Sequence, residues 1–249
     1  MNELRKIINR KNYNKIKANW TGLFNGGFPM MKSDKNEHFI KYKDIHKGKS
    51  AILYATGPSI QTYRPIGNSK DYIHIGVNRI YNYPLIIEKL NYYFFGSEYY
   101  IDTKHRRAVD SISKRKDITI FSSSFEEGIS HKIINRGNIS PEDAREIDAF
   151  PFENNLSYFT NNIAEYALLG HSIVFPSLQF ILYTGIKELY LVGCDGGFMA
   201  KDKKNHGEDN LIYWWKKFKS FKEKYYRNVS MISINPVSLK GMFNDKIIE

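Results

Sequence analysis

Short apolar runs recur from residue 51 onward, and each one ends in small or polar residues. The six runs lie at residues 51–55, 73–78, 92–95, 118–121, 189–192 and 229–234. Continuous apolar runs of this length are typical of strands that are buried on both faces of a sheet. Most intervals between them leave room for a crossover helix. The pattern therefore predicts an α/β fold with a mostly parallel, Rossmann-like sheet flanked by helices.

Two helices are predicted in the same part of the chain. The first spans residues 173–184 and is followed by Gly185, a residue that commonly ends helices. The second spans residues 209–226, where apolar side chains recur at helical spacing with lysines on the opposite face. Its apolar positions are Leu211, Trp215, Phe218, Phe221 and Tyr225. We interpret these side chains as core rather than as ligand contacts.

Residues 1–50 have a different character, being polar and basic. We predict a basic N-terminal extension at 1–50, with a polar helix near residues 2–18, and a single α/β domain at 51–249. Little of the extension is expected to be core. Residues 135–160 are polar and irregular, which indicates a small lid or an insertion.

The chain is strongly basic, with a formal net charge of +11. Residues 1–50 contribute +8 of this charge, because they hold twelve Lys/Arg and four Asp/Glu. Such a surface attracts phosphate-rich partners such as anionic membrane, a charged glycolipid or nucleic acid, or it simply keeps the protein in solution. Nucleic acid is the weaker interpretation, because no nucleic-acid-binding motif accompanies the charge. Cys194 is the only cysteine, which excludes an internal disulfide and fits a reducing compartment. No apolar run approaches the roughly 18 residues that span a bilayer. We therefore expect a cytoplasmic protein, and peripheral contact with the inner face of the membrane is compatible with the sequence.

In an open parallel sheet, the loops that follow the strands line the ligand crevice. Thr56-Gly57-Pro58-Ser59 follows the first run, and its glycine permits a tight turn and close backbone approach to a ligand. Ser59 is a candidate cap for the next helix, whose N-terminus would favour an anion. A purely structural turn is the alternative for so short a motif. Asn78 follows the second run, where its amide can hydrogen-bond a base or ribose, or cap a turn.

Other candidates lie at the ends of strands or helices. Ser97 and Ser172 are small hydrogen-bond donors, and Asp195 ends the fifth run, where it can bind ribose, contribute one metal ligand or cap a turn. No Asp-x-Asp pair and no zinc-type spacing is present, so we predict no metal. Cys194 is interpreted as a buried small residue.

A histidine in a polar loop after the fifth run is the candidate general base. The candidate is His206, because the unperturbed pKa of a histidine side chain, about 6.5, suits proton transfer at neutral pH. Glu208 or Asp209 can orient it, or can instead cap the following helix. His171, beside Ser172, is a second candidate.

The order of these motifs resembles the bacterial CMP-sialic-acid-dependent sialyltransferases that decorate surface lipooligosaccharide. The resemblance is patchy but collinear over roughly residues 50–243. Residues 55–60 are similar to that family's Gly-Asn-Gly-Pro-Ser-Leu turn, and residues 77–81 to its Cys-Asn-Gln-Phe-Tyr segment. Residues 184–195 closely follow its Gly-Tyr-Lys-Glu-Ile-Tyr-Leu-Ser-Gly-Ile-Asp segment, and residues 235–239 are similar to its Pro-Asn-Ser-Leu ending.

The resemblance implies a glycosyltransferase that moves a sugar from a nucleotide-activated, CMP-linked donor to a cell-surface glycan or glycolipid, without metal or cofactor. It implies that His206 deprotonates the acceptor. The nucleotide-binding residues would be Thr56, Gly57, Pro58, Ser59, Asn78, Ser97, Ser172, Asp195 and Ser238. The chain departs from the family pattern at Thr56, where the family has asparagine. It also lacks tyrosines between Asp195 and His206, and that interval is shorter.

Two neighbouring groups share these elements, namely flagellin-glycosylation proteins and a pterin pyrophosphokinase family. A pyrophosphokinase that uses ATP and Mg²⁺ is therefore one alternative, and a non-enzymatic nucleotide- or polyanion-binding protein is another. The oligomeric state is open, and a homo-oligomer is compatible with the sequence.

Overall fold

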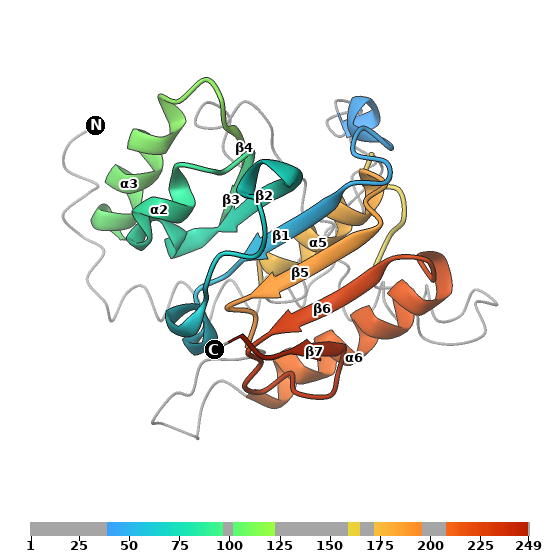
Figure 1. Ribbon diagram of the computed structural model, residues 1–249. Helices are drawn as coiled ribbons and strands as arrows, with labels where there is room; N and C mark the ends of the chain where they lie inside the picture. Colours follow the sequence, from blue (N-terminus) through green and yellow to red (C-terminus); the bar gives the residue numbers. More distant parts are fainter. Residues whose placement is uncertain (1–38, 97–101, 123–158, 165–171, 196–207, 249) are drawn as a thin grey trace, which may run out of the picture. The chain divides into compact units, whose positions relative to one another are not determined.

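The core of the molecule is a seven-stranded sheet in which every neighbouring pair of strands is parallel (Figure 1). The computed structural model describes residues 39–96, 102–122, 159–164, 172–195 and 208–248. All of them belong to one unit of the chain, Ser33–Arg136 and Tyr158–Glu249. The predicted α/β, Rossmann-like fold class is confirmed.

The six predicted strands are present, and a seventh follows them. The strands are β1 Ser50–Tyr54, β2 Tyr72–Val77, β3 Tyr92–Phe95, β4 Thr119–Ser122, β5 Glu188–Val192, β6 Ser230–Ile234 and β7 Asn244–Lys246. In the described part of the chain, the α-helices are α2 Pro84–Ile87, α3 Thr103–Ser113, α5 Val174–Tyr183 and α6 Glu208–Tyr225. Short 3-10 helices there include η3 Pro58–Thr62, η4 Ser69–Asp71 and η5 Asn78–Asn82.

The strand order is β4-β3-β2-β1-β5-β6-β7, so the chain builds outward from β1 in one direction and then returns to its other side. The continuous apolar runs explain why β1 and β5 occupy the middle, since strands there are covered on both faces. Leu53, for example, pairs with Ile75 of β2 and with Leu191 of β5. The strand order therefore changes direction between β1 and β5, and a ligand crevice is expected at the carboxyl ends of these strands.

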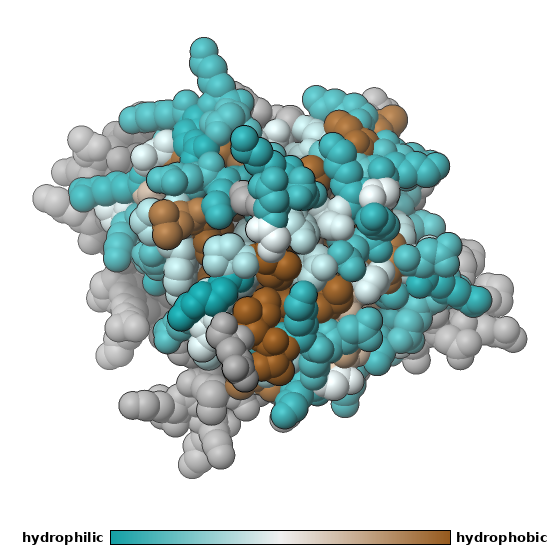
Figure 2. All heavy atoms as spheres, in the orientation of Figure 1, coloured by the Kyte–Doolittle hydropathy of each residue, from teal (hydrophilic) through white to brown (hydrophobic). Residues whose placement is uncertain are grey.

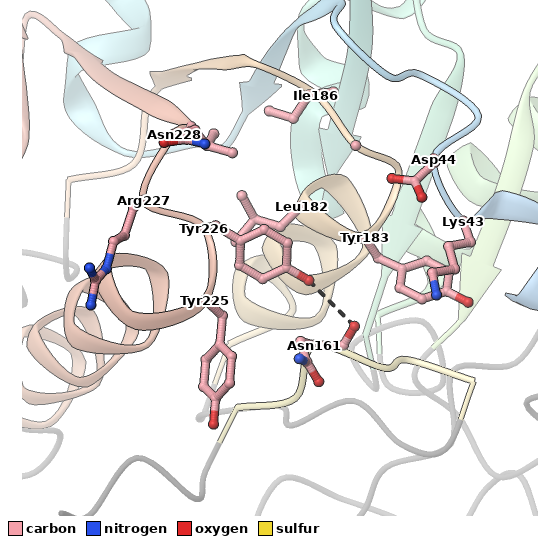
Figure 3. A pocket seen from close by; sticks show the side chains of 12 residues that line it. Lys43, Asp44, Asn161, Leu182, Tyr183, Ile186, Tyr225, Tyr226, Arg227 and Asn228 are labelled. Atoms are coloured by element: carbon pink, nitrogen blue, oxygen red, sulfur yellow. Dashed lines mark hydrogen bonds between the residues drawn. The ribbon is translucent and has the colours of Figure 1, made fainter.

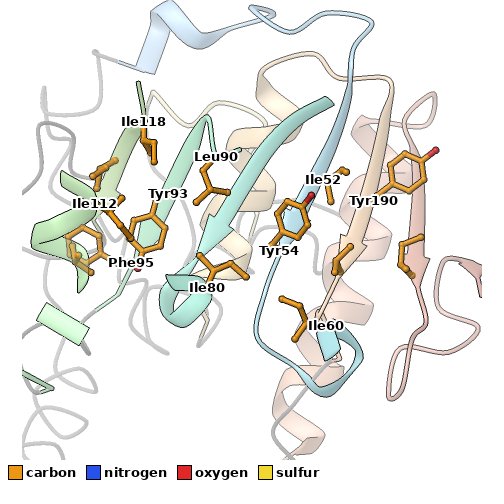
Figure 4. Packing of buried hydrophobic residues seen from close by; sticks show 14 residues of the cluster. Ile52, Tyr54, Ile60, Ile80, Leu90, Tyr93, Phe95, Ile112, Ile118 and Tyr190 are labelled. Atoms are coloured by element: carbon orange, nitrogen blue, oxygen red, sulfur yellow. The ribbon is translucent and has the colours of Figure 1, made fainter. Parts of the chain in front are cut away.

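Helices lie on both faces of the sheet. Helices α2 and α3 cover one face beside β2, β3 and β4, whereas α5 and α6 lie on the other (Figure 1). The first face carries a cluster that includes Ile52, Tyr54, Tyr93 and Phe95 (Figure 4). The second face is strongly aromatic, with Phe180 of α5 packed 4.9 Å, centroid to centroid, from both Tyr92 and Phe121.

Helices α2 and α3 and strand β7 were not predicted from the sequence, and part of the predicted extension belongs to the core. Helix α3 begins at an Asp102 cap whose side chain accepts from the backbone N–H groups of Lys104 and His105, which places a helix where none was expected. Strand β7 consists of exposed polar residues and forms through backbone pairing with β6. Phe39 and Tyr42 are buried at 0% and 5% exposure, so this part of the extension contributes to the core. The predicted boundary at residue 50 itself stays a prediction.

Helix α5 ends as predicted, since Thr184 is its C-terminal cap and Gly185 follows with a φ of +81°. None of the helices in the described part of the chain is long and apolar enough to cross a membrane. The expected helix at residues 2–18 and the expected lid at 135–160, up to residue 158, lie outside the described residues.

Candidate functional site

The loops that follow β1 and β5 are hydrogen-bonded to one another where the strand order reverses. The backbone N–H of Gly57 donates to the Gly193 carbonyl at 2.8 Å. The N–H of Ser59 donates to Asp195 Oδ2 at 2.7 Å, and the N–H of Gly193 donates to Ser59 Oγ at 3.2 Å. The turn predicted from Thr56 to Ser59 and the predicted Asp195 thus belong to one site.

Two glycines permit these loops to approach so closely. A Cβ built on Gly57 would lie 2.6 Å from the Gly193 carbonyl oxygen and would also overlap Asp195 Oδ2. A Cβ built on Gly193 would lie 2.8 Å from the Ala55 carbonyl carbon and closer still to its oxygen. Gly193 also has a φ of +67°, a conformation that residues with a side chain rarely adopt. Side chains are therefore excluded at both positions.

Asp195 joins the loops after three neighbouring strands. Asp195 is only 3% exposed. Its Oδ2 accepts a hydrogen bond from the backbone N–H of Ser59, and its Oδ1 accepts one from the backbone N–H of Val237, at 3.2 Å. Val237 lies in the loop after β6, next to the predicted site residue Ser238, which is exposed. Because both oxygens already accept backbone hydrogen bonds, Asp195 acts here as a positioning residue. Its predicted contact with nucleotide stays a prediction.

Replacing Asp195 with Ala should lower the free energy of unfolding by about 3 kcal/mol, because the buried Ser59 N–H and the partly buried Val237 N–H both lose a charged acceptor. Urea denaturation followed by circular dichroism measures this loss. The matched control is Asp71→Ala, since Asp71 is exposed and its side chain has no hydrogen bond within the described chain. Its effect should stay within about 0.5 kcal/mol. Similar losses in the two variants would show that Asp195 does not hold the loops together.

The turn leaves part of itself open to solvent. Thr56 and Pro58 are exposed, and no described residue accepts a hydrogen bond from the Thr56 hydroxyl. Ser59 is buried, and its hydroxyl accepts from Gly193. The expectation that Ser59 caps the next helix is wrong: η3 is a short 3-10 helix whose N-cap is Gly57, with no side-chain cap. Packing against β5 takes the serine hydroxyl away from the helix end.

Asn78 lies at the end of the neighbouring strand β2 and fixes the loop after β3. Its side-chain Oδ1 accepts from the Gly96 N–H at 3.0 Å, and its carbonyl accepts from the Tyr93 hydroxyl. Its φ of +45° is in the left-handed region, which asparagine tolerates better than most residues. In the described chain no acceptor contacts the Asn78 Nδ2 group, and the predicted contact of Asn78 with nucleotide stays a prediction.

The remaining predicted residues are placed unevenly. Ser172 stands at the start of α5, where its Oγ accepts from the Val174 N–H at 3.3 Å. Because α5 runs back toward the start of β5, that end of the helix lies at the carboxyl edge of the sheet. Ser97, His206 and the second histidine candidate, His171, lie outside the described residues.

The prediction that Cys194 is a buried small residue is confirmed. It is 7% exposed, and burial, aided by the adjacent Asp195, raises the pKa of its thiol. Among the residues that the structure describes, no group of three or more His, Cys, Asp or Glu side chains comes together as a metal site. The predicted absence of a metal remains a prediction.

Two contributors to the site were missed by sequence reasoning. Gly193 directly follows the fifth apolar run, and a glycine in that position could have been recognised in the sequence as a turn at the carboxyl edge of the sheet. Asn235, at the end of β6, has a φ of +46° and donates to the Thr62 carbonyl and hydroxyl in η3. It also pairs with the backbone of Ile248, so it connects the C-terminal segment to the loop after β1. No sequence pattern distinguishes this asparagine from an ordinary turn residue.

A hollow of about 280 Å³ lies elsewhere, between segments that precede β5 and β6 (Figure 3). Tyr226 stands within it, and its hydroxyl donates to the Asn161 carbonyl at 3.4 Å. The lining also includes Lys43, Asp44 and Arg227. Because these segments precede their strands, the hollow is at the amino edge of the sheet, opposite the predicted site.

Similar solved structures are sialyltransferases from Campylobacter jejuni. The sialyltransferase CstII in complex with cytidine-5'-monophosphate is 17% identical over 80% of this chain and 85% of its own, with a TM-score of 0.44. An α-2,3-sialyltransferase in apo form is 18% identical over 75% of each chain, with a TM-score of 0.41. CstII with CMP-3FNeuAc is 17% identical over 79% of this chain and 84% of its own, also with a TM-score of 0.41.

A scan against protein-family models finds no match, and a search of the curated proteins finds no significant similarity.

Proposed function

We propose that the protein is a glycosyltransferase that uses a nucleotide-activated sugar, with a CMP-linked donor favoured, and that it binds the nucleotide at the carboxyl edge of the sheet. The observation that carries the proposal is the joined pair of loops at Gly57 and Gly193, where the strand order reverses. Crevices at such points are common nucleotide sites in parallel α/β sheets. The collinear motif resemblance supplies the reaction class.

The described residues support particular roles. The exposed Thr56 hydroxyl is a hydrogen-bond donor at the mouth of the joined loops, and the Asn78 Nδ2 group is a second donor on the adjacent strand. The Asp195 carboxylate holds the loops after β1 and β6 in place by accepting hydrogen bonds from the backbone N–H groups of Ser59 and Val237. Hydrogen-bond donors suit the phosphate and ribose of a nucleotide, and the Asn78 amide needs little reorganisation when a ligand binds because its Oδ1 is already held by the Gly96 N–H.

In the proposed reaction, His206 takes the proton from an acceptor hydroxyl. The acceptor oxygen forms a bond to the anomeric carbon as the bond between that carbon and the nucleotide phosphate breaks. The electron pair leaves with the nucleoside monophosphate, and the sugar centre inverts. No metal is required in this scheme. A cell-surface glycan or glycolipid is the proposed acceptor, which places the enzyme near a membrane.

Isothermal titration of the full chain with CMP, CDP, UDP, GDP and ATP tests the nucleotide assignment. We expect CMP to bind, and Thr56→Val to weaken it about fivefold through loss of one hydrogen bond. Asn228→Ala, in the amino-edge hollow, is the control and should leave CMP affinity unchanged. Binding of ATP with Mg²⁺ in place of CMP would favour the pyrophosphokinase alternative. Binding of polyanions alone, with strong salt dependence, would favour the non-enzymatic one.

A further inference from the structure

Three segments meet at the amino edge of the sheet and form a single surface. The backbone N–H groups of Asp44, His46 and Gly48 donate to the carbonyls at the end of α5, at 2.8 to 3.1 Å. Next to them, the backbone N–H of Lys187 donates to the Lys49 carbonyl, and the backbone N–H of Ser230 donates to the Lys187 carbonyl, both at 2.9 Å. We call residues 39–49, 185–188 and 225–229 the amino-edge surface. Its parts are held together by regular backbone bonds.

The amino-edge surface is strongly basic. Its acidic residues are Asp44 and Glu188, and Glu188 accepts a hydrogen bond from Ser50. Its basic residues, all exposed, are Lys41, Lys43, Lys47, Lys49, Lys187 and Arg227. Lys43 and Arg227 lie on the lining of the hollow shown in Figure 3. This excess of positive charge is complementary to a surface of phosphates.

Large apolar side chains are exposed among these charges. Ile40 is 59% exposed, Ile45 is 50% exposed and Tyr225 is 43% exposed, which makes three of the six large hydrophobic residues that the described chain exposes. Figure 2 shows hydrophobic side chains surrounded by hydrophilic ones at the upper right, where residues 39–49 lie in Figure 1. Exposed isoleucines within a basic field suit insertion between lipid headgroups.

We propose that the amino-edge surface docks on a bilayer that contains anionic phospholipid. The lysines bind the headgroup phosphates, and Ile40 and Ile45 enter the region between headgroups and acyl chains. A nucleic acid would satisfy the charge but would offer no apolar layer to the isoleucines. The predicted nucleotide site lies at the opposite edge, about 16 Å away along a five-residue strand, and so opens away from the bilayer. This inference does not depend on the proposed reaction.

Vesicle flotation with the full chain tests the docking. We expect binding to vesicles of phosphatidylcholine mixed with phosphatidylserine, weak binding to phosphatidylcholine alone, and release by salt. The triple variant Lys43→Gln, Lys47→Gln, Lys49→Gln should bind about a hundredfold more weakly, since each lysine near an anionic surface contributes about fivefold. The charge-matched control is Lys104→Gln, Arg107→Gln, Lys240→Gln, whose residues are exposed and lie outside the amino-edge surface. It should retain binding to within about fivefold.

A second pair of variants separates lipid from other polyanions. Ile40→Ser with Ile45→Ser should weaken vesicle binding on the order of tenfold and leave binding to a single-stranded RNA unchanged. Leu85→Ser, at a residue 75% exposed outside the amino-edge surface, is its control and should have no effect. Equal losses in the two charge variants, or full vesicle binding by the isoleucine variant, would overturn the proposal. Circular dichroism confirms that each variant is folded.

Discussion

Gly193→Ala should lower the free energy of unfolding by about 4 kcal/mol, a large share of the stability of a domain of this size. A methyl group at this position overlaps the Ala55 carbonyl and lies 3.1 Å from Ile60 Cβ. Relieving such overlap costs about 1–3 kcal/mol, and the φ of +67° adds about 1–2 kcal/mol for a residue with a Cβ. The loops after β1 and β5 must separate to accept the methyl group, so the proposed binding of CMP should be lost as well.

The matched control for this prediction is Gly241→Ala. Gly241 has a φ of +76°, close to that of Gly193, but a Cβ there would meet nothing within 4 Å. Its substitution therefore reports the backbone cost alone, about 1–2 kcal/mol. Urea denaturation of both variants, monitored by circular dichroism, separates the backbone cost from the cost of the steric overlap. A separate titration of each variant with CMP measures the effect on binding. If both variants lost the same stability, the close approach of the two loops would have no energetic role.

His206→Ala should reduce the rate of sugar transfer about a thousandfold, within the range that a positioned general base contributes. The affinity for CMP should be unchanged, because the proposed role of His206 is toward the acceptor hydroxyl. Turnover with a CMP-linked donor and isothermal titration with CMP measure the two quantities. The pH profile provides a further readout, since the base acts in its neutral form and the rate of the unaltered enzyme should rise with pH through the histidine pKa.

His171→Ala is the control for this second prediction, because His171 was the other histidine that the sequence favoured. It should retain turnover. Loss of turnover in His171→Ala, with normal turnover in His206→Ala, would exchange the roles of the two histidines. Unchanged turnover in both would remove general-base catalysis by either histidine from the mechanism.

The sequence alone determined the class of fold and the position of the candidate loops after the first two strands. A run such as Ala51–Tyr54 is apolar at every position, so it is stable only with both faces covered, and that condition is met inside a parallel sheet. Gly57 and Asn78 come directly after two such runs, and parallel strands bring their carboxyl ends to one edge. Helix α5 was predictable for a similar local reason, since Gly185 ends it in the left-handed conformation.

Tertiary structure alone decided the strand order and the partners of the polar groups in the site. Nothing local to Asp195 indicates that its oxygens accept from Ser59 and Val237, which are distant in sequence and reach it only when β1 and β6 flank β5. Strand β7 is equally invisible, because Asn244-Asp245-Lys246 forms a strand through backbone pairing at an edge. Hydrogen bonds between segments that are distant in sequence form only once the fold brings those segments together. The pattern of neighbouring residues does not determine which segments will meet.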